Sequence, residues 1–194
     1  ITTGDASDPL LAQNLSSLAG KILRVNPDGS IPSDNPFNYS SIYSYGHRNV
    51  QGIAWHPITK QMYSSEHGSS GFDEINLIKP GMNYGWPEEE CKGTNISQKA
   101  IICFNPAIAP SGITFASSDK LGYQNDLIVT TLKGSHLRQI DLESGEQNNI
   151  LVGYGRLRDI VESSDGSLYV LTSNTDGRGI IQDNDDKILK ILKP

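Results

Sequence analysis

An all-β fold is predicted by three features of the 194-residue sequence: short apolar runs, frequent turn residues and an internal repeat. Glycine occurs 19 times and proline 10 times, and only short apolar runs separate them. This spacing is typical of many short strands joined by turns. Because no stretch keeps a 3.6-residue apolar period, long helices are not expected.

The expected strands follow one another along most of the chain. The segment PDGS at residues 27–30 predicts a turn, because proline presets φ and glycine accepts a positive φ. The segment PITK at residues 57–60 lies between two strand-like runs and predicts a hairpin. Strands are expected at residues 21–26, 52–56, 61–66, 74–78, 113–116, 126–132, 137–142, 149–152, 158–162, 167–173 and 187–192. Residues 1–19 are expected to form a short helical turn or a loop, and residues 87–110 a long irregular stretch.

The internal repeat has two clear copies and a looser third. The first runs from YGHR at 45–48 to DEINLI at 73–78, and the second from YGR at 154–156 to DKILKI at 186–191. The looser copy lies between them, at residues 113–140. Each copy has the three or four antiparallel strands of one β-propeller blade, and a blade needs neighbours to bury both faces. Since about three blades fit in the chain and closed propellers have about four to eight, residues 1–194 are expected to be part of a propeller.

The charge balance restricts the possible partners. The formal net charge is −6 and the sequence pI is about 5.1. A nucleic-acid partner is not expected, because phosphate binding needs a basic face. No apolar run approaches the roughly 20 residues that span a bilayer, so no membrane span is expected. An anionic ligand would need a local cluster of Arg and Lys.

The two cysteines, Cys91 and Cys103, flank one polar loop. In a secreted protein they would form a disulfide worth about 3 kcal/mol. The alternative is a pair of unrelated free thiols. The two cysteines do not form a C-x-x-C pair, and no Cys/His cluster occurs in the sequence, so a zinc site is not suggested.

Several motifs together resemble one family. They are GKILRVNPDGSIP at 20–32, YGHRNVQG at 45–52, SEHG at 65–68, DEIN at 73–76, NYGWP at 83–87, APSG at 109–112, LKG at 132–134 and RLRD at 156–159. Their order resembles the soluble PQQ-dependent sugar dehydrogenases (glucose/sorbosone dehydrogenases), and the EHG element is closer to the aldose sugar dehydrogenase branch. The resemblance implies the C-terminal half of a six-bladed propeller. Val50 and Ser69 stand where the family usually has proline.

The resemblance also implies how a cofactor would be held. PQQ carries three carboxylates, and the planar arginine fork suits carboxylates. The family's cofactor-contacting positions correspond here to Arg48, Asn49, His67, Lys133, Arg156 and Arg158. The alternative is that these cations form ordinary surface salt bridges, each worth little.

Calcium is the implied metal, and it prefers oxygen ligands that include backbone carbonyls. By the same resemblance, Gly68 and Ser69 occupy the positions whose carbonyls would hold the catalytic calcium beside PQQ. A second, structural calcium would take Glu74 and the carbonyl of Tyr84. The alternative for Glu74 is a strand-capping residue or a partner of Lys79.

The implied reaction is hydride transfer from the sugar C1 to the quinone, assisted by a histidine base. That base is expected upstream of this chain, because none of the four histidines matches it; His47 is expected to be a packed or hydrogen-bonded residue. A non-catalytic propeller that binds a partner is the main alternative, and a lactonase-like hydrolase is a weaker one. The remaining expectations are a sugar substrate, an external electron acceptor, a periplasmic or extracellular location, and a homodimer or a complementary propeller half as partner.

Overall fold

The structure is a computed structural model that describes residues 1–192, and within them nearly all regular elements are strands. The one helix among these residues is a short 3₁₀ turn, η1, which Asp8 caps by accepting the Leu10 N–H. The element bounds are β1 Thr2–Thr3, η1 Pro9–Ala12, β2 Lys21–Leu23, β3 Ile42–Tyr45, β4 Val50–Trp55, β5 Met62–Glu66, β6 Asp73–Ile78, β7 Ile102–Phe104, β8 Pro110–Phe115, β9 Leu127–Thr131, β10 His136–Ile140, β11 Gln147–Val152, β12 Leu157–Glu162, β13 Leu168–Thr172 and β14 Ile188–Ile191.

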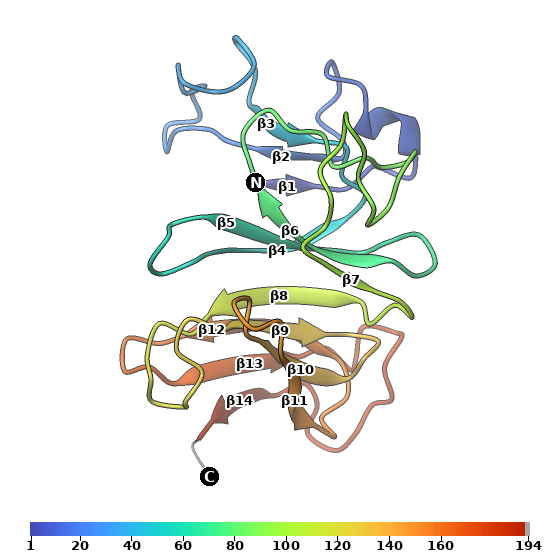
Figure 1. Ribbon diagram of the computed structural model, residues 1–194. Helices are drawn as coiled ribbons and strands as arrows, with labels where there is room; N and C mark the ends of the chain where they lie inside the picture. Colours follow the sequence, from blue (N-terminus) through green and yellow to red (C-terminus); the bar gives the residue numbers. More distant parts are fainter. Residues whose placement is uncertain (193–194) are drawn as a thin grey trace. The chain divides into compact units, whose positions relative to one another are not determined.

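The described strands form four sheets, two with four strands and two with three (Figure 1). The four-stranded sheets have the orders β4-β5-β6-β7 and β11-β10-β9-β8, and the three-stranded sheets have the orders β1-β2-β3 and β12-β13-β14. The ladders from β8 to β11 and from β12 to β14 are antiparallel. Strands that are consecutive in sequence are therefore neighbours in space, which is the order within a propeller blade.

The structure corrects the predicted strand pattern at the N-terminal end and around the cysteines. Residues 1–45 contribute a sheet that the repeat did not reveal, because β1 has only two residues and β3 leads directly into the GHRN segment. The stretch predicted to be irregular contains the three-residue strand β7, which pairs with β6. Such short strands lack the length that makes a period of two visible.

The chain forms two compact units: residues 1–51 with 66–106, and residues 52–65 with the chain from 107 on. The second unit has a core cluster formed by Ala116, Ile128, Leu137, Leu157, Ile160, Leu168 and Val170. Every residue of β9 is buried, as expected for an inner strand of a blade covered on both faces. The predicted domain of residues 1–194 ends in Lys193 and Pro194, which lie outside the described residues.

A fully buried lysine organises the N-terminal part of the first unit. Lys21 begins β2, and its side chain is inaccessible to solvent. Its ammonium donates to the carbonyls of Leu11, Ala12 and Ala19, at 2.9, 2.9 and 2.7 Å. Three carbonyl acceptors replace the water that burial removes, so Lys21 fixes the loop that contains η1.

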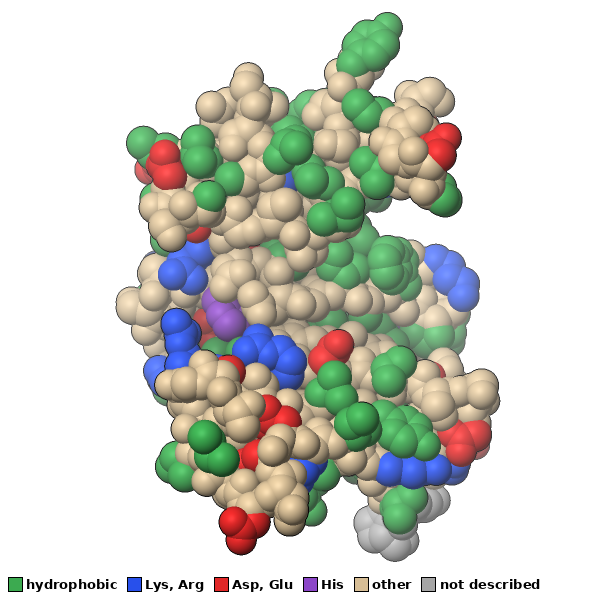
Figure 2. All heavy atoms as spheres, turned by 180° about the vertical axis from the view of Figure 1, so that it is seen from behind, with side chains coloured by type: hydrophobic (Ala, Val, Ile, Leu, Met, Phe, Trp, Pro, Cys, Tyr) green, Lys and Arg blue, Asp and Glu red, His purple; other side chains and the backbone are tan. Residues whose placement is uncertain are grey.

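Large apolar side chains remain on the surface. Figure 2 shows hydrophobic side chains over the face drawn there. Tyr39, in the loop before β3, is 97% exposed, and Ile188 of β14 is 72% exposed. The predicted homodimer or complementary propeller half stays a prediction. Among residues 1–192 no helix has the length and apolar character needed to cross a bilayer.

Candidate cofactor and cation site

A buried chain of hydrogen bonds lies at the start of the GHRN segment. Ser44 Oγ is 2.8 Å from His47 Nε2, and His47 Nδ1 is 2.8 Å from Glu66 Oε2. All three side chains are buried, and the imidazole stacks on Tyr84 with the ring centroids 4.6 Å apart. A carboxylate only accepts hydrogen bonds, so His47 donates from Nδ1. His47 is therefore a packed, hydrogen-bonded residue, as predicted.

Glu66 joins this buried chain to the first expected cofactor residue. Its Oε1 accepts the backbone N–H of Arg48. The Arg48 guanidinium lies over the Trp86 ring, 5.4 Å from its centroid, and its Nη1 is 3.4 Å from the His67 carbonyl oxygen. Asn49 Nδ2 is 3.5 Å from His67 Nδ1. Three of the six expected cofactor residues, Arg48, Asn49 and His67, thus lie together in the first unit.

In the second unit, two expected cofactor arginines share one carboxylate. Arg156 binds Asp176 Oδ2 through Nε at 3.0 Å and Nη2 at 2.8 Å, and Arg158 reaches the same oxygen at 3.2 Å. The hydrogen bonds from Arg156 lower the pKa of Asp176 to about 2. Two guanidiniums that already hold a carboxylate form a donor set that suits a polycarboxylate ligand.

Lys133 is the sixth expected cofactor residue, and it lies in the turn between β9 and β10. Its side chain is exposed, and its backbone N–H donates to the Ile108 carbonyl at 3.1 Å. His136 follows at the start of β10, where burial lowers its pKa. The structure therefore places Lys133 on an accessible turn of the second unit.

A small cavity lies in the first unit, beside Arg48 and His67. Its volume is about 10 Å³, close to the space that a single water molecule needs. The cavity is lined by Arg48, Glu66, His67, Gly68, Glu74, Tyr84, Trp86, Glu89 and Glu90. Three of the four expected metal residues, Gly68, Glu74 and Tyr84, are among them. Ser69 does not line the cavity and lies exposed in the adjoining loop.

Glu74 is a buried carboxyl that accepts two hydrogen bonds and has a raised pKa. Asn76 Nδ2 donates to its Oε2 at 2.9 Å, and the backbone N–H of Cys91 donates to its Oε1. Burial raises the pKa of Glu74 to about 7, and the negative charges of Glu66 and Glu90 add to this rise. The hydrogen-bond donors to Glu74 are thus Asn76 and the Cys91 N–H. The alternative expectation, a pairing of Glu74 with Lys79, is not the arrangement found.

The residues around Glu74 fit a hard cation. Asn76 Oδ1 is buried and has no hydrogen-bond partner among the described residues, so a buried oxygen ligand remains available next to the carboxylate. Tyr84 is fixed because its hydroxyl donates to the Leu77 carbonyl at 2.7 Å and accepts the Lys79 N–H at 2.9 Å. Within residues 1–192, no three His, Cys, Asp or Glu side chains gather as a ready metal cluster. A cation here would accordingly depend on backbone and amide oxygens as well as on Glu74.

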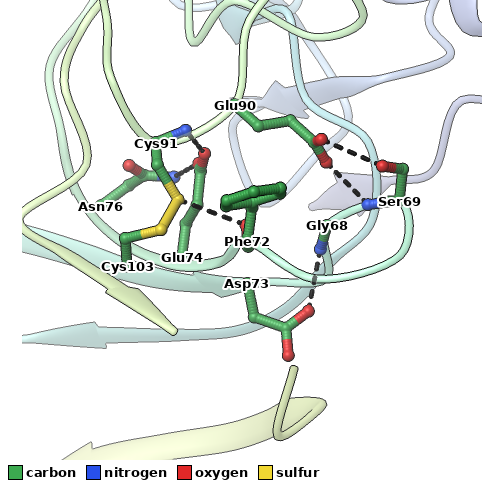
Figure 3. Close-up of a disulfide and its surroundings, with 9 residues drawn as sticks. All are labelled: Gly68, Ser69, Phe72, Asp73, Glu74, Asn76, Glu90, Cys91 and Cys103. Carbon is green, nitrogen blue, oxygen red and sulfur yellow. Dashed lines mark hydrogen bonds between the residues drawn. A yellow bond between two sulfur atoms is a disulfide. The ribbon is translucent and has the colours of Figure 1, made fainter. Parts of the chain in front are cut away.

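The loop after β5 requires glycine at position 68. A Cβ on Gly68 would collide with the Gly71 carbonyl and with the backbone of Phe72. The Gly68 N–H donates to Asp73 Oδ1 at 2.9 Å, and Ser69 donates to Glu90 (Figure 3). The loop therefore folds back on itself, held at Asp73 on one side and at Glu90 on the other.

A disulfide joins Cys91 to Cys103 next to this loop (Figure 3). Cys103 lies in β7 and is the ladder partner of Glu74 in β6. Cys91 follows Glu90, and its N–H binds Glu74. The disulfide thus ties the segment that carries Glu90 and Cys91 to the strand next to Glu74.

Sequence reasoning missed three functional neighbours of the expected residues: Glu66, Glu90 and Asp176. Glu66 is part of the SEHG motif, so its position carried a signal. Glu90 ends a run of three glutamates, which usually indicates a solvated segment, and Asp176 precedes a glycine in a turn. Neither local pattern shows which donor the carboxylate will meet.

Comparison with known proteins identifies the family to which this all-β chain belongs. The family model "Glucose / Sorbosone dehydrogenase" matches residues 1–182, so the chain belongs to this family. It is similar to the PQQ-bound aldose sugar dehydrogenase of Streptomyces coelicolor, with 41% identity, a TM-score of 0.87, and coverage of 96% of this chain and 56% of that one. It is also similar to a putative glucose dehydrogenase of Thermus thermophilus, with 40% identity, a TM-score of 0.89, and coverage of 99% and 60%.

Among curated relatives, the aldose sugar dehydrogenase YliI of Escherichia coli is 35% identical over 91% of this chain and 54% of its own length. The chain thus spans about half the length of the relatives it matches. The predicted family and the predicted all-β propeller class are confirmed.

Proposed function

We propose that this chain is part of an enzyme that oxidises an aldose at C1 to the lactone, with PQQ as cofactor and calcium as metal. The observation that carries the proposal is the 41% identity, over 96% of the chain, to a PQQ-bound aldose sugar dehydrogenase. When bound, PQQ would accept the hydride and calcium would polarise its quinone oxygen.

The residues proposed to hold PQQ act through charge and hydrogen bonding. Arg156 and Arg158 would bind cofactor carboxylates, and their shared carboxylate partner supports this role because it already orients both guanidiniums. Arg48 is proposed to bind from the first unit, where Trp86 and the His67 carbonyl orient it. The full proposed set is Arg48, Asn49, His67, Lys133, Arg156 and Arg158.

The residues proposed for calcium supply oxygen ligands. The carbonyls of Gly68 and Ser69 are assigned to the catalytic ion, and Glu74 with the Tyr84 carbonyl to a structural ion. The cavity beside Gly68, Glu74 and Tyr84 supports the second assignment, because burial and negative neighbours raise the pKa of Glu74 in the absence of a compensating cation.

No catalytic base is assigned among the histidines of this chain. His47 is occupied on both ring nitrogens, and His56 Nδ1 accepts the backbone N–H groups of Ile58 and Thr59. The base is proposed to lie upstream, in the part of the relatives that this chain does not match. A sugar substrate, an external electron acceptor and an oxidising periplasmic or extracellular location belong to the same proposal, and the disulfide supports the location.

The test is sugar oxidation by the intact protein that contains this chain. It is supplied with PQQ, Ca²⁺ and an artificial electron acceptor, and a panel of aldoses is assayed by acceptor reduction. A PQQ titration followed by absorbance is run in parallel on the wild type and on the double variant Arg48→Ala, Lys133→Ala. We expect aldose-dependent turnover in the wild type and markedly weaker PQQ binding in the variant.

A matched control removes the same charge elsewhere. The double variant Lys60→Ala, Lys99→Ala changes two exposed lysines outside the proposed set and should bind PQQ as the wild type does. Absence of both turnover and PQQ binding in the wild type would contradict the proposal and favour a non-catalytic binding module.

A further inference from the structure

The Gly68–Ser69 peptide is held by a glutamate from a distant part of the chain. Glu90 Oε1 accepts the Ser69 N–H at 2.6 Å, and Glu90 Oε2 accepts the Ser69 hydroxyl at 2.9 Å (Figure 3). The two residues are 21 positions apart, and both lie in the first unit. One carboxylate therefore takes both donors of Ser69.

This contact determines the direction of the Gly68 carbonyl. The Ser69 N–H and the Gly68 C=O belong to the same peptide group, which is planar, and in a trans peptide they point in opposite directions. A carboxylate that fixes the N–H direction therefore also fixes the C=O direction. The Gly68 N–H is held separately by Asp73, so both peptide groups that flank Gly68 are anchored.

Glu90 is itself anchored by covalent structure. The next residue, Cys91, forms the disulfide with Cys103 in β7, and its N–H is bound to Glu74. The segment that carries Glu90 cannot swing away from β6 and β7 without breaking these links. The Gly68–Ser69 peptide is thus held against a fixed point, although Ser69 itself is exposed.

We propose that Glu90 is a positioning residue for the loop that binds the catalytic calcium: by holding both donors of Ser69, it orients the Gly68 carbonyl as a metal ligand. The inference rests on the proposed function, which assigns that carbonyl to calcium. Glu90 acts through the peptide and not as a ligand. Residues that orient metal ligands typically change metal affinity by about 10- to 100-fold when they are replaced.

The test is a Ca²⁺ titration of the intact protein by calorimetry, with the melting temperature in excess chelator as a second readout. Glu90→Ala removes both contacts and should weaken calcium binding about 10-fold at the Gly68 site, while the structural ion at Glu74 binds as before. Glu90→Gln keeps the shape, and its amide can still accept the N–H and donate to the Ser69 oxygen, so it should restore most of the affinity. Glu88→Ala removes the same charge two residues away and should bind calcium like the wild type. The melting temperature in chelator should change little, because an exposed pair contributes little to stability.

The results that would contradict the proposal can be told apart from one another. Glu90→Gln binding as weakly as Glu90→Ala, or Glu88→Ala losing as much affinity, would mean that charge alone matters and would overturn the positioning role. Unchanged affinity in Glu90→Ala would overturn it as well, while leaving the proposed calcium site intact. A wild type that binds no calcium would overturn the metal assignment of the proposed function and the inference with it.

Discussion

His47 Nδ1 lies 2.8 Å from Glu66 Oε2, and both side chains are almost completely shielded from solvent. The other oxygen of this carboxylate accepts the backbone N–H of Arg48. A single glutamate therefore links a buried imidazole to the backbone of the expected cofactor arginine. The pair gives the GHRN segment a defined conformation before any ligand binds.

Replacing His47 with alanine should destabilise the fold by about 3 kcal/mol, because it leaves a buried carboxylate with one donor fewer. The stack on Tyr84 is lost as well. Urea unfolding followed by tryptophan fluorescence measures the change. Ser44→Ala is the control, since it removes only the outer hydrogen bond of the chain and should cost about 1 kcal/mol. Equal losses in the two variants would contradict the central role of the His47–Glu66 contact.

The sequence predicted the fold where strands are long enough to show a pattern. The predicted strand at 126–132 corresponds to β9, and the hairpin around residues 57–60 corresponds to the turn between β4 and β5. The strands β1 and β7 were missed because two or three residues carry no readable period. Pairing with distant strands, rather than local propensity, makes these segments extended.

Motifs predicted candidate site residues but not the contacts that hold them. The GHRN and EHG elements contain Arg48, Asn49, His67 and Gly68. Arg48, His67 and Gly68 line one small cavity, and Asn49 contacts His67. The partners Glu90 and Asp176 depend on contacts between loops that are far apart in sequence. Such contacts are set by the path of the backbone, so no local spacing indicates them.

Lys21→Met should destabilise the protein by about 2 kcal/mol at pH 7, because three carbonyls lose their buried donor. The difference should also depend on pH. Burial lowers the pKa of Lys21 to about 8, so between pH 8 and its usual value of 10.5 the unfolded state binds more protons than the folded state. Stability therefore rises with pH in this window in the wild type relative to the variant.

Chemical denaturation of both proteins at pH 7 and pH 10 measures this difference. The free-energy gap between wild type and Lys21→Met should be larger at pH 10. A gap that shrinks as the pH rises would show that the carbonyls stabilise the ammonium form more than burial disfavours it.

Gly68→Ala should reduce the stabilisation that calcium confers, because a Cβ at this position forces the loop away from Gly71 and Phe72 and removes the ligand of the catalytic ion. The melting temperature with and without Ca²⁺ measures the effect. Gly29→Ala is a suitable control, since Gly29 also lies in a turn, at φ +85°, but an added Cβ meets no atom there. The control should lower stability without reducing the calcium-dependent shift, whereas a full calcium shift in Gly68→Ala would contradict the assignment of this loop.

Asp176→Asn should make the protein less sensitive to acid. Hydrogen bonds from Arg156 lower the pKa of Asp176 from 3.8 to about 2, so the carboxylate contributes its stabilisation above pH 3.8 and loses it as the pH falls toward 2. The asparagine variant keeps the shape but lacks this titration, so its melting temperature should start lower at neutral pH and fall less between pH 4 and pH 2. Scanning calorimetry across this range compares the two slopes. Parallel curves would mean that Arg156 and Arg158 do not depend on Asp176 for their orientation, and the case for a pre-oriented carboxylate-binding pair in the second unit would then be lost.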